Sequence, residues 1–319
     1  MKKILIALII PFAVFVGAVA GDDKPAAKPV DKPYTKLTAE EIPGYLQDIS
    51  VTIHADGSQG SGVVVTRNSV NYVLTAGHVV EHLRKTRSVI DPKTGHERTK
   101  IEFNDAKVVK EVYDEDGRSV GRLMMDAEVI RYSDHHNNED LALLRLRKKD
   151  FIHCTAHFDK KGAVPVGTDL LHVGSLLGQQ GSNSLTTGVV SQTGRVLNNT
   201  IYDQSTCAAF PGSSGGGLYR KADGSYVGML VRGAGETFNL YVPMRRISKW
   251  ADRTGVAFIL DDTLPVPDDK TLRSTPIEEA GSDASDKVGA AADKAPPPHE
   301  REFPFLIKRT FPVIPLAKE

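Results

Sequence analysis

The stretch Leu74-Thr75-Ala76-Gly77-His78-Val79-Val80 (LTAGHVV) places a histidine directly after a run of strand-forming residues. Tyr72 to Thr75 has the β-branched and aromatic composition of a strand, and the alanine-glycine pair after it makes a turn that presents His78. Upstream, Gly62 to Thr66 (GVVVT) predicts another strand, and Arg67 to Asn71 (RNSVN) joins the two as a hairpin. A lone histidine is most often structural, so its chemistry depends on what the rest of the chain brings to it.

Two further segments supply the groups that a histidine needs for acyl transfer. Asn138 to Leu144 (NEDLALL) puts Asp140 at the mouth of an apolar strand, and Phe210 to Gly217 (FPGSSGGG) places serines in a glycine-rich turn. A serine hydroxyl keeps its proton at neutral pH, so it needs an imidazole base and an acid that orients that base. It also needs backbone N–H groups directed at the developing oxyanion. The sequence therefore predicts a catalytic triad of His78, Asp140 and Ser214.

Two members of this triad have rivals nearby. Asp134 and Glu139 are also acids, but only Asp140 directly precedes the apolar run, as an orienting carboxylate shielded from water should. Ser213 shares the turn with Ser214, but the glycines two residues before and one residue after the nucleophile select Ser214. We therefore keep Asp140 and Ser214.

The central part of the chain has the pattern of an all-β protein. From about residue 38 to residue 260, short β-branched runs alternate with clusters of glycine, asparagine, aspartate and serine, a spacing typical of a sandwich or barrel. One helix is expected at Arg245 to Thr254, because Ile247, Trp250 and Ala251 share one face and Gly255 follows as a stop.

The three segments, in the order His, Asp, Ser, resemble those of the chymotrypsin-fold serine proteases, and their details are similar to the bacterial HtrA/DegP-type trypsin-like proteases. The resemblance covers about residues 45 to 258, and its matching blocks are Gly60–Val65, Thr75–Val80, Asp140–Leu144, Thr187–Arg195, Pro211–Gly216 and, more weakly, Tyr241–Met244. It implies two antiparallel β-barrels with the active site in the crevice between them, a short C-terminal helix, and a serine endopeptidase that needs no cofactor and no metal.

The sequence departs from this family in two places. Ser213 stands where the HtrA group usually has asparagine, a position that contributes its backbone. No glycine-rich peptide-binding loop and no PDZ-like domain is expected after residue 258. The PDZ-regulated cage behaviour of the family is therefore not predicted for this chain.

The resemblance also assigns roles around the triad. The backbone N–H groups of Gly212 and Ser214 are expected to form the oxyanion hole. The substrate-binding residues that it implies are Ala208, Ala209 and Phe210 in the pocket wall, Val231 and Gly233 in the edge strand that pairs with substrate, and Asn239 opposite. No acidic residue stands at the base of this pocket, so we expect it to accept small or medium aliphatic side chains.

The two ends of the chain differ from its centre. Residues 1–20 have a basic start, an apolar run and small residues at Ala18 and Ala20, the layout of a secretory signal peptide, with an uncleaved anchor as the alternative. Residues 21–40 are a linker rich in proline, lysine and alanine, residues 41–260 are the predicted protease domain, and residues 261–319 are a low-complexity, disordered tail. The tail ends in an apolar, proline-containing segment, Phe303 to Leu316.

These features predict an exported protein, periplasmic or secreted, without a membrane span after cleavage. Whether the apolar segment docks on the domain or on a partner subunit, and whether the chain forms a homo-oligomer, stays open. The function that we predict is hydrolysis of peptide bonds in exported or misfolded proteins. The alternatives are a dedicated maturation protease with few substrates, or a non-catalytic protease-fold module for binding or chaperoning.

Composition narrows the classes of partner. The 319 residues hold 40 basic and 40 acidic side chains, a balance that disfavours a general nucleic-acid binder. Two cysteines, Cys154 and Cys207, rule out a four-cysteine zinc site; they could pair in an oxidising compartment or remain buried thiols. His135 and His136 are adjacent and point apart, which favours a polar loop over a metal site.

Overall fold

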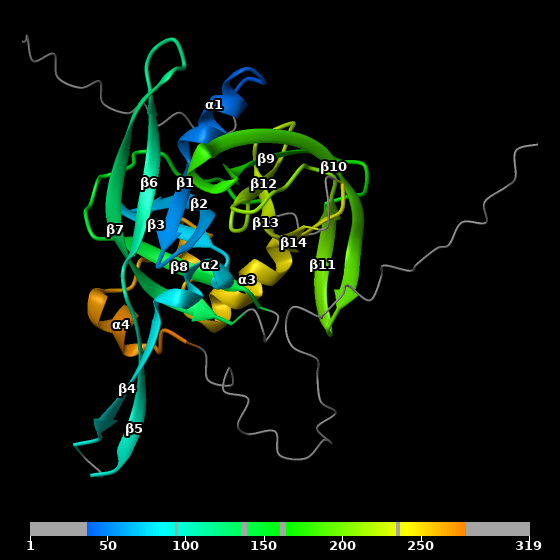
Figure 1. Cartoon of the computed structure of the whole chain (residues 1–319). Helices are drawn as coiled ribbons and strands as arrows, with labels where there is room; N and C mark the ends of the chain where they lie inside the picture. Colours follow the sequence, from blue (N-terminus) through cyan, green and yellow to red (C-terminus); the bar gives the residue numbers. More distant parts are fainter. Residues whose placement is uncertain (1–36, 93–94, 135–138, 160–163, 234–236, 279–319) are drawn as a thin grey trace, which may run out of the picture.

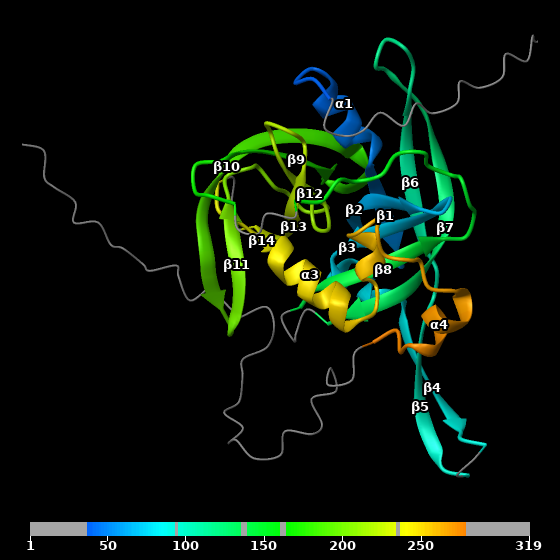
Figure 2. The same ribbon diagram turned by 180° about the vertical axis from the view of Figure 1, so that it is seen from behind.

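The computed structural model describes residues 37–92, 95–134, 139–159, 164–233 and 237–278. Two closed antiparallel barrels of six strands each dominate this part of the chain (Figures 1 and 2). The strand order is β1-β2-β3-β8-β7-β6 in the first barrel and β10-β11-β14-β13-β12-β9 in the second. The predicted all-β, chymotrypsin-like double barrel is therefore confirmed.

The first barrel follows a helix and contains the turn that carries His78. Its strands are β1 (Ser50–Ala55), β2 (Ser58–Arg67), β3 (Val70–Thr75), β6 (Ala106–Tyr113), β7 (Ser119–Ser133) and β8 (Leu141–Leu146). Helix α1 (Glu41–Asp48) precedes them, and α2 (Gly77–Val80) with the 3-10 turn η2 (Glu81–Leu83) follows β3. The predicted hairpin joins β2 to β3 at Asn68 and Ser69, whose φ angles of 48° and 64° are those of a two-residue turn between twisted strands.

The second barrel carries the serine turn. Its strands are β9 (Asp169–Leu176), β10 (Gly181–Leu197), β11 (Thr200–Ser205), β12 (Gly217–Arg220), β13 (Tyr226–Gly233) and β14 (Asn239–Pro243), with a 3-10 turn η3 (Gly178–Gln180) between β9 and β10. Strand β13 pairs with β12 through Met229 and with β14 as far as Gly233. The last residues of β13 therefore lie beside the serine turn rather than beside β12.

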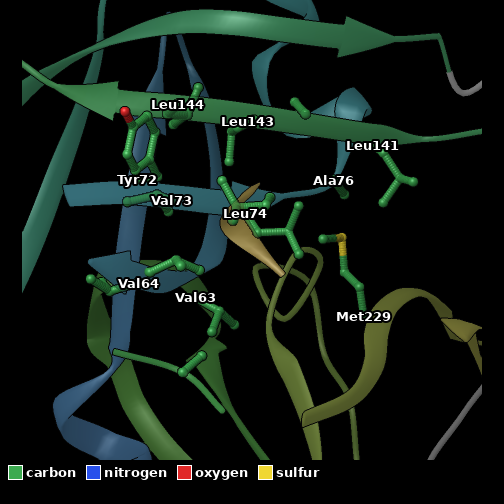
Figure 3. Close-up of a cluster of buried hydrophobic side chains, with 14 of the residues drawn as sticks. Val63, Val64, Tyr72, Val73, Leu74, Ala76, Leu141, Leu143, Leu144 and Met229 are labelled. Atoms are coloured by element: carbon green, nitrogen blue, oxygen red, sulfur yellow. The ribbon is translucent and has the colours of Figure 1, made fainter. Parts of the chain in front are cut away.

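The main apolar cluster fills the first barrel and continues into the seam between the barrels. Leu74, Leu143 and Leu144 are fully buried in it, and Met229 of the second barrel joins the same cluster (Figure 3). The predicted helix is α3 (Met244–Arg253), and it buries Ile247, Trp250 and Ala251 as expected. Burial of this shared apolar surface provides the main stabilisation of the two-barrel arrangement.

Helix α3 also ties the barrels together by a polar contact. The Nε1–H of Trp250, which is fully buried, donates a hydrogen bond of 2.7 Å to Oγ of Ser133 on β7. Because a buried indole N–H left without an acceptor would be costly, this contact stabilises the packing of α3 against β7.

Two β-hairpins project from the first barrel. Strands β4 (Arg84–Ile90) and β5 (Glu97–Phe103) form a separate two-stranded sheet, and the far ends of β6 and β7 extend away on the opposite side (Figure 1). Their outer positions expose large apolar side chains, with Ile90 at 72% and Val120 at 60%. The charged segment after His82 thus forms arms outside the core.

The chain continues to pack after residue 260, which corrects the predicted domain boundary. After the 3-10 turn η4 (Ala257–Ile259), helix α4 (Asp269–Ser274) buries Leu272, and the N–H of Tyr132 on β7 donates 2.7 Å to the carbonyl of Ile277. Residues 263–278 are therefore part of the domain and not of a disordered tail. The polar composition of this segment concealed the fact that its few apolar residues are placed to cover the first barrel.

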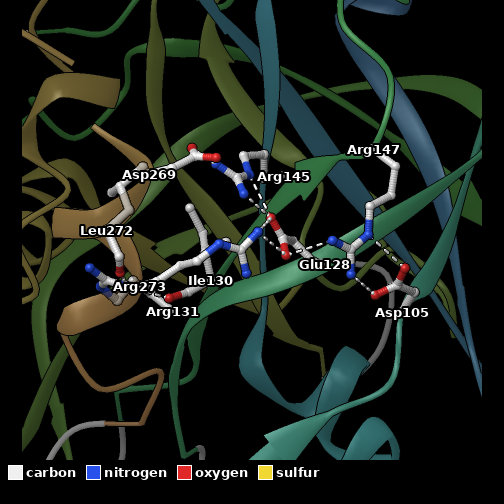
Figure 4. A network of polar contacts seen from close by, with 9 residues as sticks. All are labelled: Asp105, Glu128, Ile130, Arg131, Arg145, Arg147, Asp269, Leu272 and Arg273. Atoms are coloured by element: carbon white, nitrogen blue, oxygen red, sulfur yellow. Dashed lines mark hydrogen bonds and ion pairs between the residues drawn. The ribbon is translucent and has the colours of Figure 1, made fainter. Parts of the chain in front are cut away.

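Charged side chains attach α4 to the first barrel. The carboxylate of Glu128 accepts from Nε of Arg145 at 2.6 Å, from Nη1 of Arg147 at 2.8 Å and from Nη2 of Arg273 at 3.2 Å (Figure 4). Nη1 of Arg145 also contacts Asp269 at 2.5 Å. Because Glu128 and Arg145 are largely buried, each supplies the counter-charge that the other needs.

No helix in the part of the chain that the structure describes is long and apolar enough to cross a membrane. The predicted signal peptide, most of the linker and the apolar segment Phe303–Leu316 lie outside the described residues.

Leu143 tests the core of the first barrel. Replacing Leu143, which is fully buried, with alanine should lower the free energy of unfolding by about 3 kcal/mol, because it removes buried methyl groups and leaves a cavity. Urea unfolding measures the change. Val120→Ala on the exposed end of β7 is the control and should stay within about 0.5 kcal/mol of the unsubstituted protein. Equal losses in the two variants would contradict this account of the core.

Candidate active site

The structure brings the three predicted catalytic residues together from both barrels. His78 lies on α2 directly after β3, Asp140 directly precedes β8, and Ser214 lies between β11 and β12. The N–H of Ser61 on β2 donates 2.8 Å to the carbonyl of Ser214. A Cβ atom on Gly215 would lie 3.0 Å from the backbone nitrogen of Ala76, so the serine turn lies directly against the turn that carries His78.

Asp140 holds His78 through both its side chain and its backbone. Nδ1 of His78 is 3.0 Å from each carboxylate oxygen of Asp140, and the backbone N–H of His78 donates 2.9 Å to Oδ1. Asp140 is 1% exposed, whereas the side chain of His78 is 31% exposed. The carboxylate therefore favours the tautomer that carries its proton on Nδ1, which leaves Nε2 as the proton acceptor.

The pKa of His78 reflects this contact. Burial lowers the pKa of the imidazole, but the hydrogen bond and the negative charge of Asp140 raise it and prevail, so it lies above its ordinary value. The positive charge of Arg232 acts in the opposite direction to Asp140. A histidine poised in this way can accept a proton near neutral pH.

The turn before Ser214 has a fixed peptide orientation. Phe210 to Ser213 is closed by a 2.9 Å hydrogen bond from the N–H of Ser213 to the carbonyl of Phe210. Pro211 is the second residue of this four-residue turn, and Gly212, with a φ of +95°, is the third. This is the pattern of a type II turn. A Cβ atom on Gly212 would lie 2.3 Å from the carbonyl oxygen of Ser175, so only glycine fits here.

A loop of the second barrel fixes which way this peptide faces. The carbonyl of Pro211 accepts 2.8 Å from the N–H of Leu177. In a trans peptide the N–H points opposite to the carbonyl, so the N–H of Gly212 faces away from Leu177. Within the described residues, no acceptor takes the N–H of Gly212 or of Ser214. Both groups are therefore available to an oxyanion.

Sequence reasoning missed the residues that support this turn. Oγ of Ser61 donates 2.7 Å to the carbonyl of Gly212 and accepts 2.8 Å from the N–H of Ser175. The N–H of Gln179 donates 3.0 Å to Oε1 of Gln59, which anchors the Leu177 loop to the first barrel. These contacts join residues more than 110 positions apart in the sequence, so no local pattern around Gln59 or Ser61 predicts them.

A pocket of about 380 Å³ opens beside Ser214. Its lining is formed by Ala209, Phe210, Pro211, Ser213, Ser214, Leu230, Arg232 and Gly233. Among the predicted substrate-binding residues, Ala209, Phe210 and Gly233 line this pocket, whereas Ala208, Val231 and Asn239 do not.

Asn239 lies behind the pocket wall. It is fully buried, its Nδ2 donates 2.7 Å to the carbonyl of Cys207, and its Oδ1 would be 2.5 Å from a Cβ on Gly233. A side chain at position 233 would therefore press against the amide of Asn239, which lies directly behind this wall.

The cysteines and the adjacent histidines add nothing to the site. Cys154 and Cys207 are both free thiols, and burial raises the pKa of Cys207 to about 11. His135 and His136, predicted to lie in a polar loop, are outside the described residues. Among the residues that the structure does describe, no group of three histidine, cysteine, aspartate or glutamate side chains is placed to hold a metal ion.

The double barrel, with an imidazole, a buried carboxylate and a serine turn meeting at the seam, defines the class of trypsin-like peptidases. Comparison with known families agrees, because the trypsin-like peptidase domain matches residues 60–229. This protein therefore belongs to the trypsin-like peptidase family.

A curated relative and two solved structures are similar to this chain. A serine protease Do-like HtrA from Lactobacillus helveticus is 26% identical over 178 residues, which cover 54% of this chain and 35% of that protein. The chain thus spans about a third of the length of this curated relative.

Among solved structures, a serine endoprotease from Yersinia pestis is 17% identical with a TM-score of 0.49, covering 71% of this chain and 68% of that one. An HtrA-type protease, AlgW, with a tripeptide is 20% identical with a TM-score of 0.48, covering 70% and 64%.

The contact between Asp140 and His78 can be tested by titration. Asp140→Asn should lower the pKa of His78, because burial then acts without the opposing negative charge. Asparagine tolerates the positive φ of 53° at this position, so the backbone should be retained. NMR titration of the imidazole resonances measures the shift, with His78→Gln used to assign the signal.

A reference signal is present in the same protein. His172 is fully buried, which lowers its pKa to about 4, and its titration should be unchanged by the substitution. An unchanged pKa of His78 in Asp140→Asn would show that this carboxylate does not set its protonation.

Proposed function

We propose that this protein is a serine endopeptidase that hydrolyses peptide bonds through His78, Asp140 and Ser214. The observation that carries the proposal is the convergence at one seam of an Asp140-bound imidazole and a serine turn with two available N–H groups. A chain kept only as a binding module has no need of this combination. Membership of the trypsin-like peptidase family supports the same activity.

The reaction follows from the roles of these groups. Nε2 of His78 removes the hydroxyl proton of Ser214 as Oγ attacks the scissile carbonyl, and Asp140 stabilises the imidazolium that forms. The N–H groups of Gly212 and Ser214 bind the oxyanion. The imidazolium then protonates the leaving amine, and water attacks the acyl-enzyme by the same sequence of proton transfers. No metal or cofactor takes part in these steps.

The substrates that we propose are exported or misfolded polypeptides, with the protein acting in the periplasm or as a secreted enzyme. The support for export is the signal-peptide pattern of residues 1–20 and the similarity to HtrA-type proteases.

A mechanism-based probe tests the activity directly. A fluorophosphonate should label the protein, and Ser214→Ala should abolish labelling and peptide hydrolysis, because Oγ is the proposed nucleophile. Ser213→Ala is the matched control and should keep labelling. Labelling should also weaken as the pH falls through the raised pKa of His78, since protonated imidazole cannot accept the proton. A probe that labels neither protein would favour the non-catalytic module instead.

The pocket predicts the residue whose carbonyl is cleaved. Ala209 and Gly233 line it, and none of the described lining residues is acidic, so valine, alanine or leucine should be preferred over lysine or arginine by about tenfold or more in kcat/KM. Cleavage of a peptide library, with the cut sites read by mass spectrometry, measures this preference. Dominant cleavage after lysine or arginine would contradict the assignment of the pocket.

A further inference from the structure

The wall of the site carries an arginine, Arg232, to which none of the described residues gives a carboxylate partner. Arg232 borders the pocket beside Ser214, its guanidinium lies over the ring of Tyr202, and its charge reaches His78. The neighbouring cations are neutralised differently, since Nη2 of Arg246 lies 3.4 Å and Nη2 of Arg253 lies 3.3 Å from the carboxylate of Glu139. Among the described residues, no acidic side chain pairs with Arg232.

Arg232 is held in position by an aromatic ring. Its guanidinium carbon lies 5.6 Å from the centroid of the Tyr202 ring, and that of Arg246 lies 4.9 Å from the same ring. Tyr202 is fully buried on β11, so its ring is a fixed platform. A cation over the face of an aromatic ring is attracted by the ring, and this contact does not use up the guanidinium N–H groups, which can still bind an oxygen acceptor.

The two last residues of β13 face opposite sides of the strand. Gly233 faces Ala209, which packs on the core of the second barrel. Arg232 faces Tyr202, which belongs to the cluster at the seam between the barrels. This alternation is that of any extended strand.

A substrate strand alongside β13 would repeat this alternation. If the cleaved residue places its side chain in the pocket by Ala209 and Gly233, the residue before it points the other way, to the side of Arg232. Directly opposed residues on paired strands bring their side chains within contact distance. The side chain nearest to the guanidinium is therefore that of the residue immediately before the cleaved one, called here the second position.

We propose that Arg232 is a specificity-determining residue that selects a carboxylate, glutamate or aspartate, at the second position of the substrate. The proposal rests on the proposed peptidase function and names the substrate class of that same site. A carboxylate there would provide the counter-charge that the described protein does not give to Arg232, through a charge-assisted hydrogen bond.

Paired peptides test this selection. Two fluorogenic substrates, Ala-Ala-Glu-Val and Ala-Ala-Gln-Val on the same leaving amine, differ only in charge at the second position. At pH 8 and low salt the ratio of their kcat/KM values should favour glutamate by about tenfold, and added salt should reduce it. Arg232→Gln should bring the ratio to about one, Arg232→Lys should keep part of it, and Arg232→Glu should favour a lysine peptide.

A matched control distinguishes an effect of Arg232 from the effect of removing any one positive charge. Arg195 also stacks on an aromatic ring, with its guanidinium carbon 5.3 Å from the centroid of Phe238, and it is exposed, but it does not line the pocket. Arg195→Gln should therefore leave the glutamate-to-glutamine ratio unchanged. Fluorophosphonate labelling of each variant shows that its site is intact.

The outcomes separate the role of Arg232 from the peptidase function on which it rests. Hydrolysis of both peptides at equal rates, or a glutamate preference that survives Arg232→Gln, would overturn the role of Arg232 and leave the peptidase intact. If no variant hydrolyses either peptide, the peptidase proposal fails, and binding of the same peptides to Ser214→Ala decides the present one. Tighter binding of the glutamate peptide that disappears with Arg232→Gln supports it, and equal or absent binding overturns it.

Discussion

The backbone hydrogen bond from Ser61 to the carbonyl of Ser214 is the contact on which the arrangement of the site depends. It joins a strand of the first barrel to the serine turn of the second, and the imidazole and the hydroxyl come from opposite sides of that seam. Close approach of two backbones requires that no side chain stands between them. Gly60 satisfies this requirement, since a Cβ there would lie 3.0 Å from the Ser214 carbonyl and within 2.7 Å of both Val79 methyl groups.

The turn from Phe210 to Ser213 depends on a second contact, made by the loop around Leu177. The direction of the Gly212 N–H follows from the hydrogen bond between Leu177 and Pro211, and the Leu177 loop is itself tied to Gln59 of the first barrel. An exposed loop that makes few such bonds is stabilised less than the barrels that it joins. The orientation of the turn is thus a property of the interface between the barrels rather than of the glycine-rich sequence by itself.

Electrostatics gives the site its asymmetry. Asp140 binds His78, and Glu139 pairs with Arg246 and Arg253. Among the described residues, the positive charge of Arg232 therefore stays without a nearby carboxylate. Such an arginine can recognise a carboxylate without taking Asp140 away from His78. The same charge moderates the rise in the pKa of His78 that Asp140 causes.

The sequence by itself determined the local features. Short β-branched runs between clusters of turn-forming residues predicted the barrel strands, and the apolar face of Arg245 to Thr254 predicted α3, because both patterns are local in the sequence. The position of each candidate catalytic residue beside its strand was also local. Tertiary structure alone decided the supporting contacts of Ser61 and Leu177, the packing of residues 263–278, and the isolation of Arg232 from any described acid. These depend on residues that are distant along the chain, and no pattern of neighbouring letters encodes which distant groups meet.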